Sequence, residues 1–131
     1  MILLEELNPV SLSERIKKVI AVLKYEIERL EAGDERNPPT QEGNEKLAAL
    51  VIDYQQLVQR TRKYMLEGKP DEATRKVANK LERSWRDIYH NYVMKYKELV
   101  FKHNETHENK IKPLDIRMDY EIKESVKYFD Y

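Results

Sequence analysis

The chain has 131 residues, which suits one compact domain and is too short for two of ordinary size. Charged side chains make up 37% of it, yet its 24 acidic and 24 basic residues cancel, which argues against a protein that coats nucleic acid through bulk positive charge. It contains no cysteine, which excludes disulfides, thiolate nucleophiles and cysteine metal sites.

The first four residues are apolar, but Glu5 and Glu6 follow directly. This start lacks the basic region and the apolar length of a secretory signal. No stretch reaches the ~18 apolar residues of a membrane span. We therefore expect a protein of the cytoplasm, or of a virion assembled there, that is not secreted by a signal peptide and does not span a membrane.

A first helix is predicted over residues 11–32. Ser11 and Glu14 have the spacing of a capping box. Apolar residues then recur at alternating steps of four and three, as on a helix that packs lengthwise on another: Ile16, Ile20, Leu23, Ile27 and Leu30. Gly33 can end this helix in a left-handed cap. Residues 33–44 contain two prolines and a second glycine, so we expect them to form the main loop.

A second helix is predicted over residues 45–67, where the same apolar spacing returns at Leu47, Val51, Tyr54, Val58, Thr61 and Met65. Gly68 and Pro70 end it.

The third predicted helix spans residues 70–107 and is the longest, because no glycine and no further proline interrupts it after Pro70. At about 100° per residue, one broad face carries its apolar residues: Val77, Leu81, Trp85, Ile88, Tyr89, Tyr92, Tyr96, Leu99 and Val100. Such a helix is on the order of 55 Å long. Two helices of about two-thirds that length are too short to cover it, so we expect part of the apolar face to be left for the C-terminal segment or for another chain.

The C-terminal segment 113–131 is the least regular part. Apolar and polar residues alternate from Leu114 to Ile122, which locally favours a strand, but a single strand has no partner in a helical chain. We expect an extended segment that closes the bundle and ends in a short helix. The predicted fold class is therefore all-α, a single helical-bundle domain over residues 1–131 with two medium helices packed on one long helix.

An aromatic ladder follows the long helix at Trp85, Tyr89, Tyr92 and Tyr96. Such ladders can stack nucleobases, but they also fill cores and subunit interfaces. Because this ladder coincides with the aliphatic face of its helix, we interpret the four residues as core or interface anchors.

Charge is unevenly distributed along the chain. Residues 59–86 hold nine basic and four acidic side chains, whereas the first 45 residues hold six basic and ten acidic. Three interpretations remain open: a solvated face held by i,i+4 ion pairs, head-to-tail attraction between copies, or a basic hairpin that contacts phosphates. The possible phosphate contacts are Arg60, Arg62, Lys63, Arg75, Lys76, Arg83 and Arg86.

No constellation of catalytic residues is apparent. His103 and His107 stand four apart, a spacing that can bind a divalent metal, but no third ligand can be identified and we assign no metal. The three glycines form no phosphate loop, and no acid pair or serine–histidine arrangement has a meaningful spacing. We expect no cofactor, no small-molecule substrate and no enzymatic activity.

The composition is rich in Lys, Glu, Ile and Tyr, with few glycines and no cysteine, a profile common in proteins from hot environments. In size, composition and helical layout the chain resembles the small all-helical structural proteins of viruses that infect hyperthermophilic archaea, such as the Acidianus two-tailed virus. This resemblance implies a thermophilic virion coat component. The size and the basic hairpin are also similar to the helical small subunits of type III CRISPR complexes.

Two functional hypotheses follow. The first is a non-enzymatic structural protein, most plausibly of a virion, that assembles with itself or with other structural proteins through the open face of its long helix. The alternative is a helical nucleic-acid-binding subunit that uses the basic hairpin 59–86.

Overall fold

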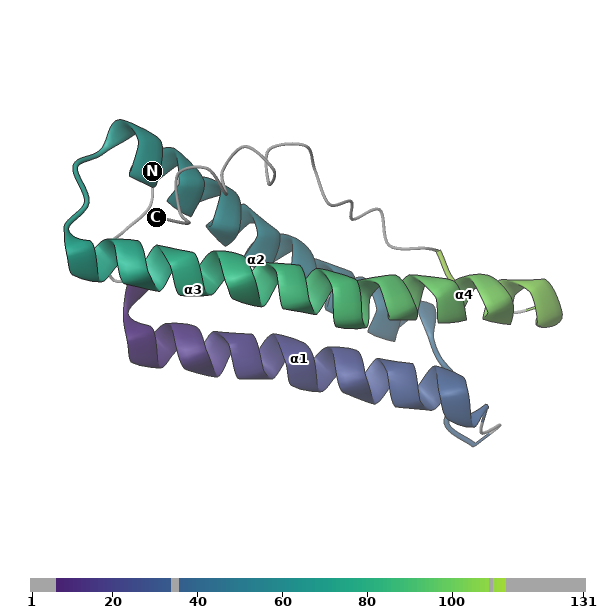
Figure 1. Cartoon of the computed structure of the whole chain (residues 1–131). Helices are drawn as coiled ribbons and strands as arrows, with labels where there is room; N and C mark the ends of the chain where they lie inside the picture. Colours follow the sequence, from purple (N-terminus) through teal and green to yellow (C-terminus); the bar gives the residue numbers. More distant parts are fainter. Residues whose placement is uncertain (1–6, 34–35, 109, 113–131) are drawn as a thin grey trace.

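The computed structural model describes residues 7–33, 36–108 and 110–112, and its fold is all-α (Figure 1). Three helices pack side by side: α1 spans Pro9–Ala32, α2 spans Gln41–Glu67, and the third runs for 35 residues from Glu72 to Thr106. The described residues contain no strand. The prediction of an all-α bundle built on one long helix is confirmed.

The long helix consists of α3 (Glu72–Ile88), η2 (Tyr89–Val93) and α4 (Met94–Thr106) in direct succession. In η2 the chain makes a π-helical turn, in which the Met94 amide donates to the carbonyl of Tyr89, five residues back. A π turn widens a helix by one residue without breaking it. The helix therefore continues past Trp85, but the faces on which its residues lie change at η2.

The first helix begins earlier than predicted. Asn8 is its N-cap, because its side-chain oxygen accepts from the amides of Val10 at 3.0 Å and Ser11 at 3.2 Å, and Pro9 occupies the first turn. The predicted capping box of Ser11 and Glu14 is therefore wrong, since both residues lie inside α1.

The other two starts also differ from the prediction. Thr40 caps α2 by accepting from the Gly43 amide at 3.0 Å, so that α2 begins at Gln41 rather than at residue 45. Asp71 caps α3 by accepting from the Thr74 amide at 2.8 Å, so that the long helix begins at Glu72 rather than at Pro70.

Two glycines end helices for different reasons. Gly33 has φ 59° and ψ 28°, the left-handed cap that the sequence predicted for α1. Gly68 follows α2 with an extended backbone, but a Cβ there would lie 2.8 Å from the carbonyl oxygen of Tyr64. The turn between α2 and α3 therefore depends on the close approach that only glycine permits.

One hydrophobic core runs along the bundle. It contains, among others, Leu12, Val19, Leu23 and Ile27 of α1, Leu47, Val51, Tyr54, Leu57 and Val58 of α2, and Leu81, Trp85, Ile88, Val93, Tyr96 and Val100 of the long helix. α2 packs on α1 and α3, whereas α1 also packs on η2 and α4.

After α4 the chain turns back, and residues 110–112, here called the strap, lie against the bundle. Ile111 is 2% exposed, and the Asn104 side chain bonds both its amide and its carbonyl at 2.7 Å. The Lys112 amide donates to Gln41 at 2.9 Å, and its carbonyl accepts from Asn44 at 2.7 Å. Four backbone groups are thus satisfied by three side-chain amides. The predicted C-terminal segment 113–131 lies outside the described residues.

The aromatic face of the long helix is closed within the bundle. Trp85, Tyr89 and Tyr96 are 0%, 9% and 1% exposed, and Tyr92 is half-buried with the Lys24 ammonium 5.9 Å from its ring centre. Of the two interpretations of the ladder, burial supports core for Trp85, Tyr89 and Tyr96, and the expectation that Tyr96 anchors another chain is wrong.

Candidate functional site

The described residues carry most of their positive charge in one half of the bundle. This half, here called the basic half, lies around the turn between α2 and α3 and comprises residues 7–19 and 53–91. It holds twelve basic and seven acidic side chains, whereas the rest of the described chain holds nine basic and eight acidic. The basic half therefore has an excess of five positive charges.

No acidic end lies opposite the basic half within the described chain. The acidic excess of the first 45 residues comes from Glu5, Glu6, Asp34 and Glu35, all outside the described residues. The described part of that stretch has six acidic and six basic side chains. The described geometry therefore lends no support to head-to-tail attraction between oppositely charged ends.

The predicted phosphate contacts separate into three groups. Lys63, Arg75, Lys76 and Arg83 are exposed, as a phosphate contact requires. Arg60 and Arg86 are half-buried and have other partners within the chain. Arg62 is 5% exposed and pairs with Glu82.

The pair of Arg62 and Glu82 connects α2 to α3 inside the bundle. The Arg62 Nε donates to Oε1 of Glu82, and its Nη2 donates to Oε2 at 3.2 Å. Both side chains are almost fully buried, so this bidentate ion pair belongs to the interior. The prediction that Arg62 contacts phosphate is therefore wrong.

Six of the exposed cations of the basic half lie on α2, on α3 or in the turn between them and form what is here called the basic strip: Lys63, Lys69, Arg75, Lys76, Lys80 and Arg83. Lys76, Lys80 and Arg83 recur at steps of four and three along the outer side of α3. Lys63 lies near the end of α2, and Lys69 lies in the turn. Lys69 and Lys80 were counted in the sequence excess but not proposed as contacts, and their exposure adds them to the strip.

Two acidic residues beside the turn, Asp71 and Glu72, make local contacts, whereas Glu67 at the end of α2 is exposed and adds a negative charge next to the strip. The Asp71 carboxylate caps α3, and its hydrogen bonds with Thr74 lower the pKa of this carboxyl below its usual value. Glu72 lies 3.8 Å from Lys76, but both side chains are exposed, and such a pair contributes little. Asp71 and Glu72 therefore contribute to the first turn of α3, and the strip keeps six cations against these two acids and Glu67.

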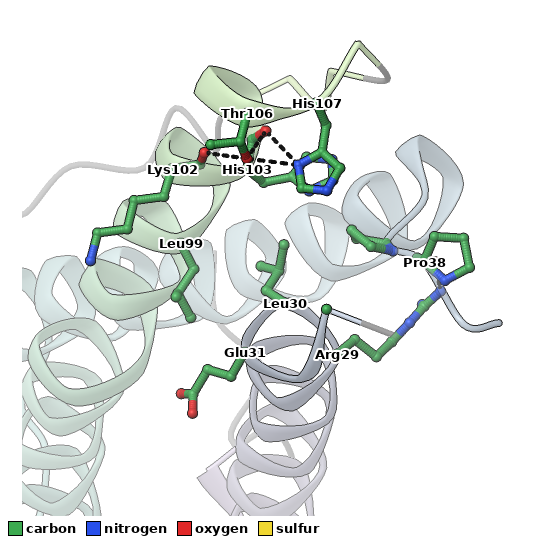
Figure 2. A pocket seen from close by; sticks show the side chains of 11 residues that line it. Arg29, Leu30, Glu31, Pro38, Leu99, Lys102, His103, Thr106 and His107 are labelled. Carbon is green, nitrogen blue, oxygen red and sulfur yellow. Dashed lines mark hydrogen bonds between the residues drawn. The ribbon is translucent and has the colours of Figure 1, made fainter. Parts of the chain in front are cut away.

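A pocket of about 670 Å³ lies at the other end of the bundle (Figure 2). Its lining comes from the end of α1, the loop after it, and α4: Arg29, Leu30, Glu31, Gly33, Pro38, Pro39, Leu99, Lys102, His103, Thr106 and His107. The two histidine rings stack at 4.1 Å, with 12° between their planes. Nδ1 of His107 lies 2.8 Å from Oγ1 of Thr106 and 3.1 Å from the carbonyl oxygen of His103.

This pocket places the histidine pair at the end of a helix rather than in a cluster of ligands. Among residues 7–33, 36–108 and 110–112, no three His, Asp or Glu side chains are arranged to hold a metal ion. Arg29 is engaged by Glu26 at 3.1 Å and by the carbonyl of Pro38. The guanidinium of Arg29 in the last turn of α1 is also what the helix dipole favours.

The buried phenols of Tyr54 and Tyr96 have structural surroundings. Burial raises the pKa of both hydroxyls above the usual value, so both stay protonated near neutral pH. The Tyr96 hydroxyl donates to Asn44 at 2.7 Å, which in turn holds the strap. Neither group is placed as a nucleophile.

None of the helices in the described part of the chain is long and apolar enough to cross a membrane.

Comparison of the sequence with protein-family models and with curated proteins, and of the structure with solved structures, found no significant match.

Proposed function

We propose that this chain is a non-enzymatic helical subunit that binds nucleic acid through phosphate contacts from the basic strip. The observation that supports the proposal most directly is the excess of five positive charges in the basic half, together with the exposure of all six strip residues. Lysine and arginine that neutralise phosphates release condensed counterions, which favours binding without any base contact.

Rigidity of the surface supports the same proposal. Lys76, Lys80 and Arg83 lie on α3, and α3 is fixed to α2 by the buried pair of Arg62 and Glu82. From Lys76 to Arg83 the helix rises about 10 Å, so Lys76, Lys80 and Arg83 are spaced along about 10 Å of one rigid helix. Cations held in place by a rigid element lose less conformational freedom on binding.

The experiment is a titration of a fluorescently labelled nucleic acid, read by anisotropy over a series of salt concentrations. The test variant is Lys80→Glu/Arg83→Glu, and the control is Lys102→Glu/Lys110→Glu, which changes the net charge equally in the other half. The strip variant should bind about tenfold more weakly or worse, and the control should stay within about twofold. Equal losses in both variants, or affinity that does not fall with salt, would contradict the proposal.

Arg62 is left unchanged in the test variant although it lies among the basic residues of the hairpin. Removing Arg62 leaves the Glu82 carboxylate buried without its main partner, so the variant would lose stability as well as charge. Loss of binding could then reflect unfolding.

A second candidate is self-association as a structural protein, including the virion role that the resemblance implies. The supporting observation is that Met94 and Phe101 are 44% and 63% exposed and stand seven residues apart, hence on one side of α4. This surface replaces the aromatic face as the candidate contact between copies. Sedimentation velocity should show association that rises with concentration and is weakened by Phe101→Ser; a monomer at every concentration would exclude it.

A further inference from the structure

We infer that the basic strip binds duplex nucleic acid in preference to a single strand. This inference rests on the proposed function and concerns which form of nucleic acid the strip fits. Proteins that bind single strands combine a cationic groove with aromatic rings on which the unstacked bases lie. Proteins that bind a duplex through its backbone need cations alone.

The tyrosine and tryptophan rings of the basic half are occupied by the fold, and the exposed His90 ring packs edge-on against Tyr89 with 5.5 Å between the ring centres. Tyr54 and Trp85 are fully buried, and Tyr89 is 9% exposed. Tyr64 is half-buried, and its ring lies so close to Gly68 that a Cβ there would come within 3.0 Å of it. Tyr64 therefore covers the turn rather than offering a free face.

The largely exposed aromatic rings lie elsewhere. Among the tyrosine, tryptophan and phenylalanine rings of the described residues these are Tyr25 and Phe101, at 52% and 63%, and both belong to the other half of the bundle. The strip thus offers charge without a stacking platform in the described part of the chain.

Charge density then decides between the two forms. A duplex carries one negative charge per ~1.7 Å of its axis, about twice the density of one of its strands. A surface that attracts phosphates but cannot stack bases gains more from the denser array. The strip residues also come from two packed helices, α2 and α3, and from the turn between them, so they do not form a single row along one helix.

The strip residues are all lysine or arginine, and they lie on α2, on α3 and in the turn between them. Contacts of this kind fix a protein on the duplex backbone but read no bases. We therefore expect binding that depends weakly on sequence.

The test compares a labelled duplex of about 20 base pairs with one of its strands, using the full chain at equal salt. The duplex should bind at least about fivefold more tightly, and the logarithm of its affinity should fall with the logarithm of salt with a slope of about −3 to −4.5, as three to five phosphate contacts require. Equal or tighter binding of the single strand would overturn the inference.

Two variants separate the possible failures. Tyr64→Leu should leave single-strand binding within about twofold, whereas a stacking role for Tyr64 would give a much larger loss and contradict the inference. If the single strand is preferred but Lys80→Glu/Arg83→Glu still abolishes binding, the proposed function stands and only the inference fails. If neither form binds, both fail.

Discussion

At the scale of single residues, Trp85 occupies the centre of the core. Its ring centre lies 6.0 Å from those of Tyr54 on α2 and Tyr89 on the same helix, and the residue is fully buried. Its Nε1 finds no hydrogen-bond partner among the described residues. Trp85 therefore stabilises the fold through packing, and the sequence predicted its central position because its neighbours share the apolar arc of the helix.

Replacing Trp85 by alanine should lower the free energy of unfolding by about 3–5 kcal/mol, since it leaves a large void between α2 and α3. Urea denaturation followed by circular dichroism measures this loss. Trp85→Phe is the matched control, because it keeps an aromatic ring and sacrifices no hydrogen bond, and should cost less than half as much. A loss below about 1 kcal/mol for the alanine variant would show that the core has been assigned wrongly.

The buried pair of Arg62 and Glu82 gives a second prediction at this scale. Arg62→Met alone should destabilise the protein by about 3–5 kcal/mol, because it removes the Arg62 guanidinium that pairs with the buried Glu82 carboxylate. Arg62→Met/Glu82→Leu should regain most of that loss, because neither charge then remains inside. A complete double-mutant cycle by denaturation measures the coupling, and losses that simply add would contradict a direct pair.

At the scale of elements, periodicity predicted all three helices, but the residues that begin them were harder to assign. Asn8 and Ser11 are both favourable N-cap residues. In the structure Asn8 is the N-cap, and Pro9 occupies the first turn that follows it. Gly43 discouraged an early start for α2, yet Thr40 caps that helix and Gly43 lies in its first turn. Such competitions between neighbouring caps are too small in energy for the sequence alone to resolve.

The π turn is a feature that periodicity could not predict. An uninterrupted α-helix places Val93 away from the apolar arc and Tyr92 within it, but Val93 is fully buried and Tyr92 is half-buried. The wider turn at η2 rotates the residues after it, which brings Val93 into the core. This local change depends on packing against α1. An analysis that assumes 3.6 residues per turn throughout the helix therefore cannot predict it.

The Asp71 cap of α3 should make the stability of the protein depend on pH in the acidic range. The pKa of Asp71 is lower in the folded protein than its ordinary value of 3.8, so its ionised form stabilises the folded state at higher pH. That contribution is lost as the pH falls through the lowered pKa. When the pH is lowered from about 5 to about 2.5, the melting temperature of Asp71→Ala should therefore fall by less than that of the parent protein. The melting temperature of the control Asp87→Ala should fall as much as that of the parent. Parallel curves for all three proteins would contradict this role.

Of the three amide side chains that bond the strap, Asn104 is the one that should hold Ile111 in place. Asn104→Ala removes both hydrogen bonds to the Ile111 backbone, so we expect a loss of about 1–3 kcal/mol and faster exchange of the Ile111 amide. Asn91→Ala, at an exposed position in η2, is the control. Hydrogen exchange followed by NMR makes the measurement. Unchanged protection of Ile111 in Asn104→Ala would show that Asn104 does not hold the strap.

At the scale of the whole molecule, the sequence predicted a basic region but could not separate its buried from its exposed members. Arg62 carries the same charge as Lys63 and is its neighbour in the sequence. Only the position of Glu82, twenty residues away on another helix, decides the role of Arg62. The open aromatic face was predicted by comparing helix lengths. Length was a poor guide because α1 and α2 are staggered: α2 packs on α3, while α1 extends past it onto η2 and α4.

The central claim is that nucleic acid binds at the basic half, and NMR mapping tests it most directly. A short duplex is added to the labelled chain at moderate salt, and shifts of the backbone amides are followed. The account predicts that the largest shifts fall in residues 63–86, around Lys63, Lys80 and Arg83, and that those lining the pocket near His103 change little. Shifts centred on the pocket, or no shifts at any position, would contradict it.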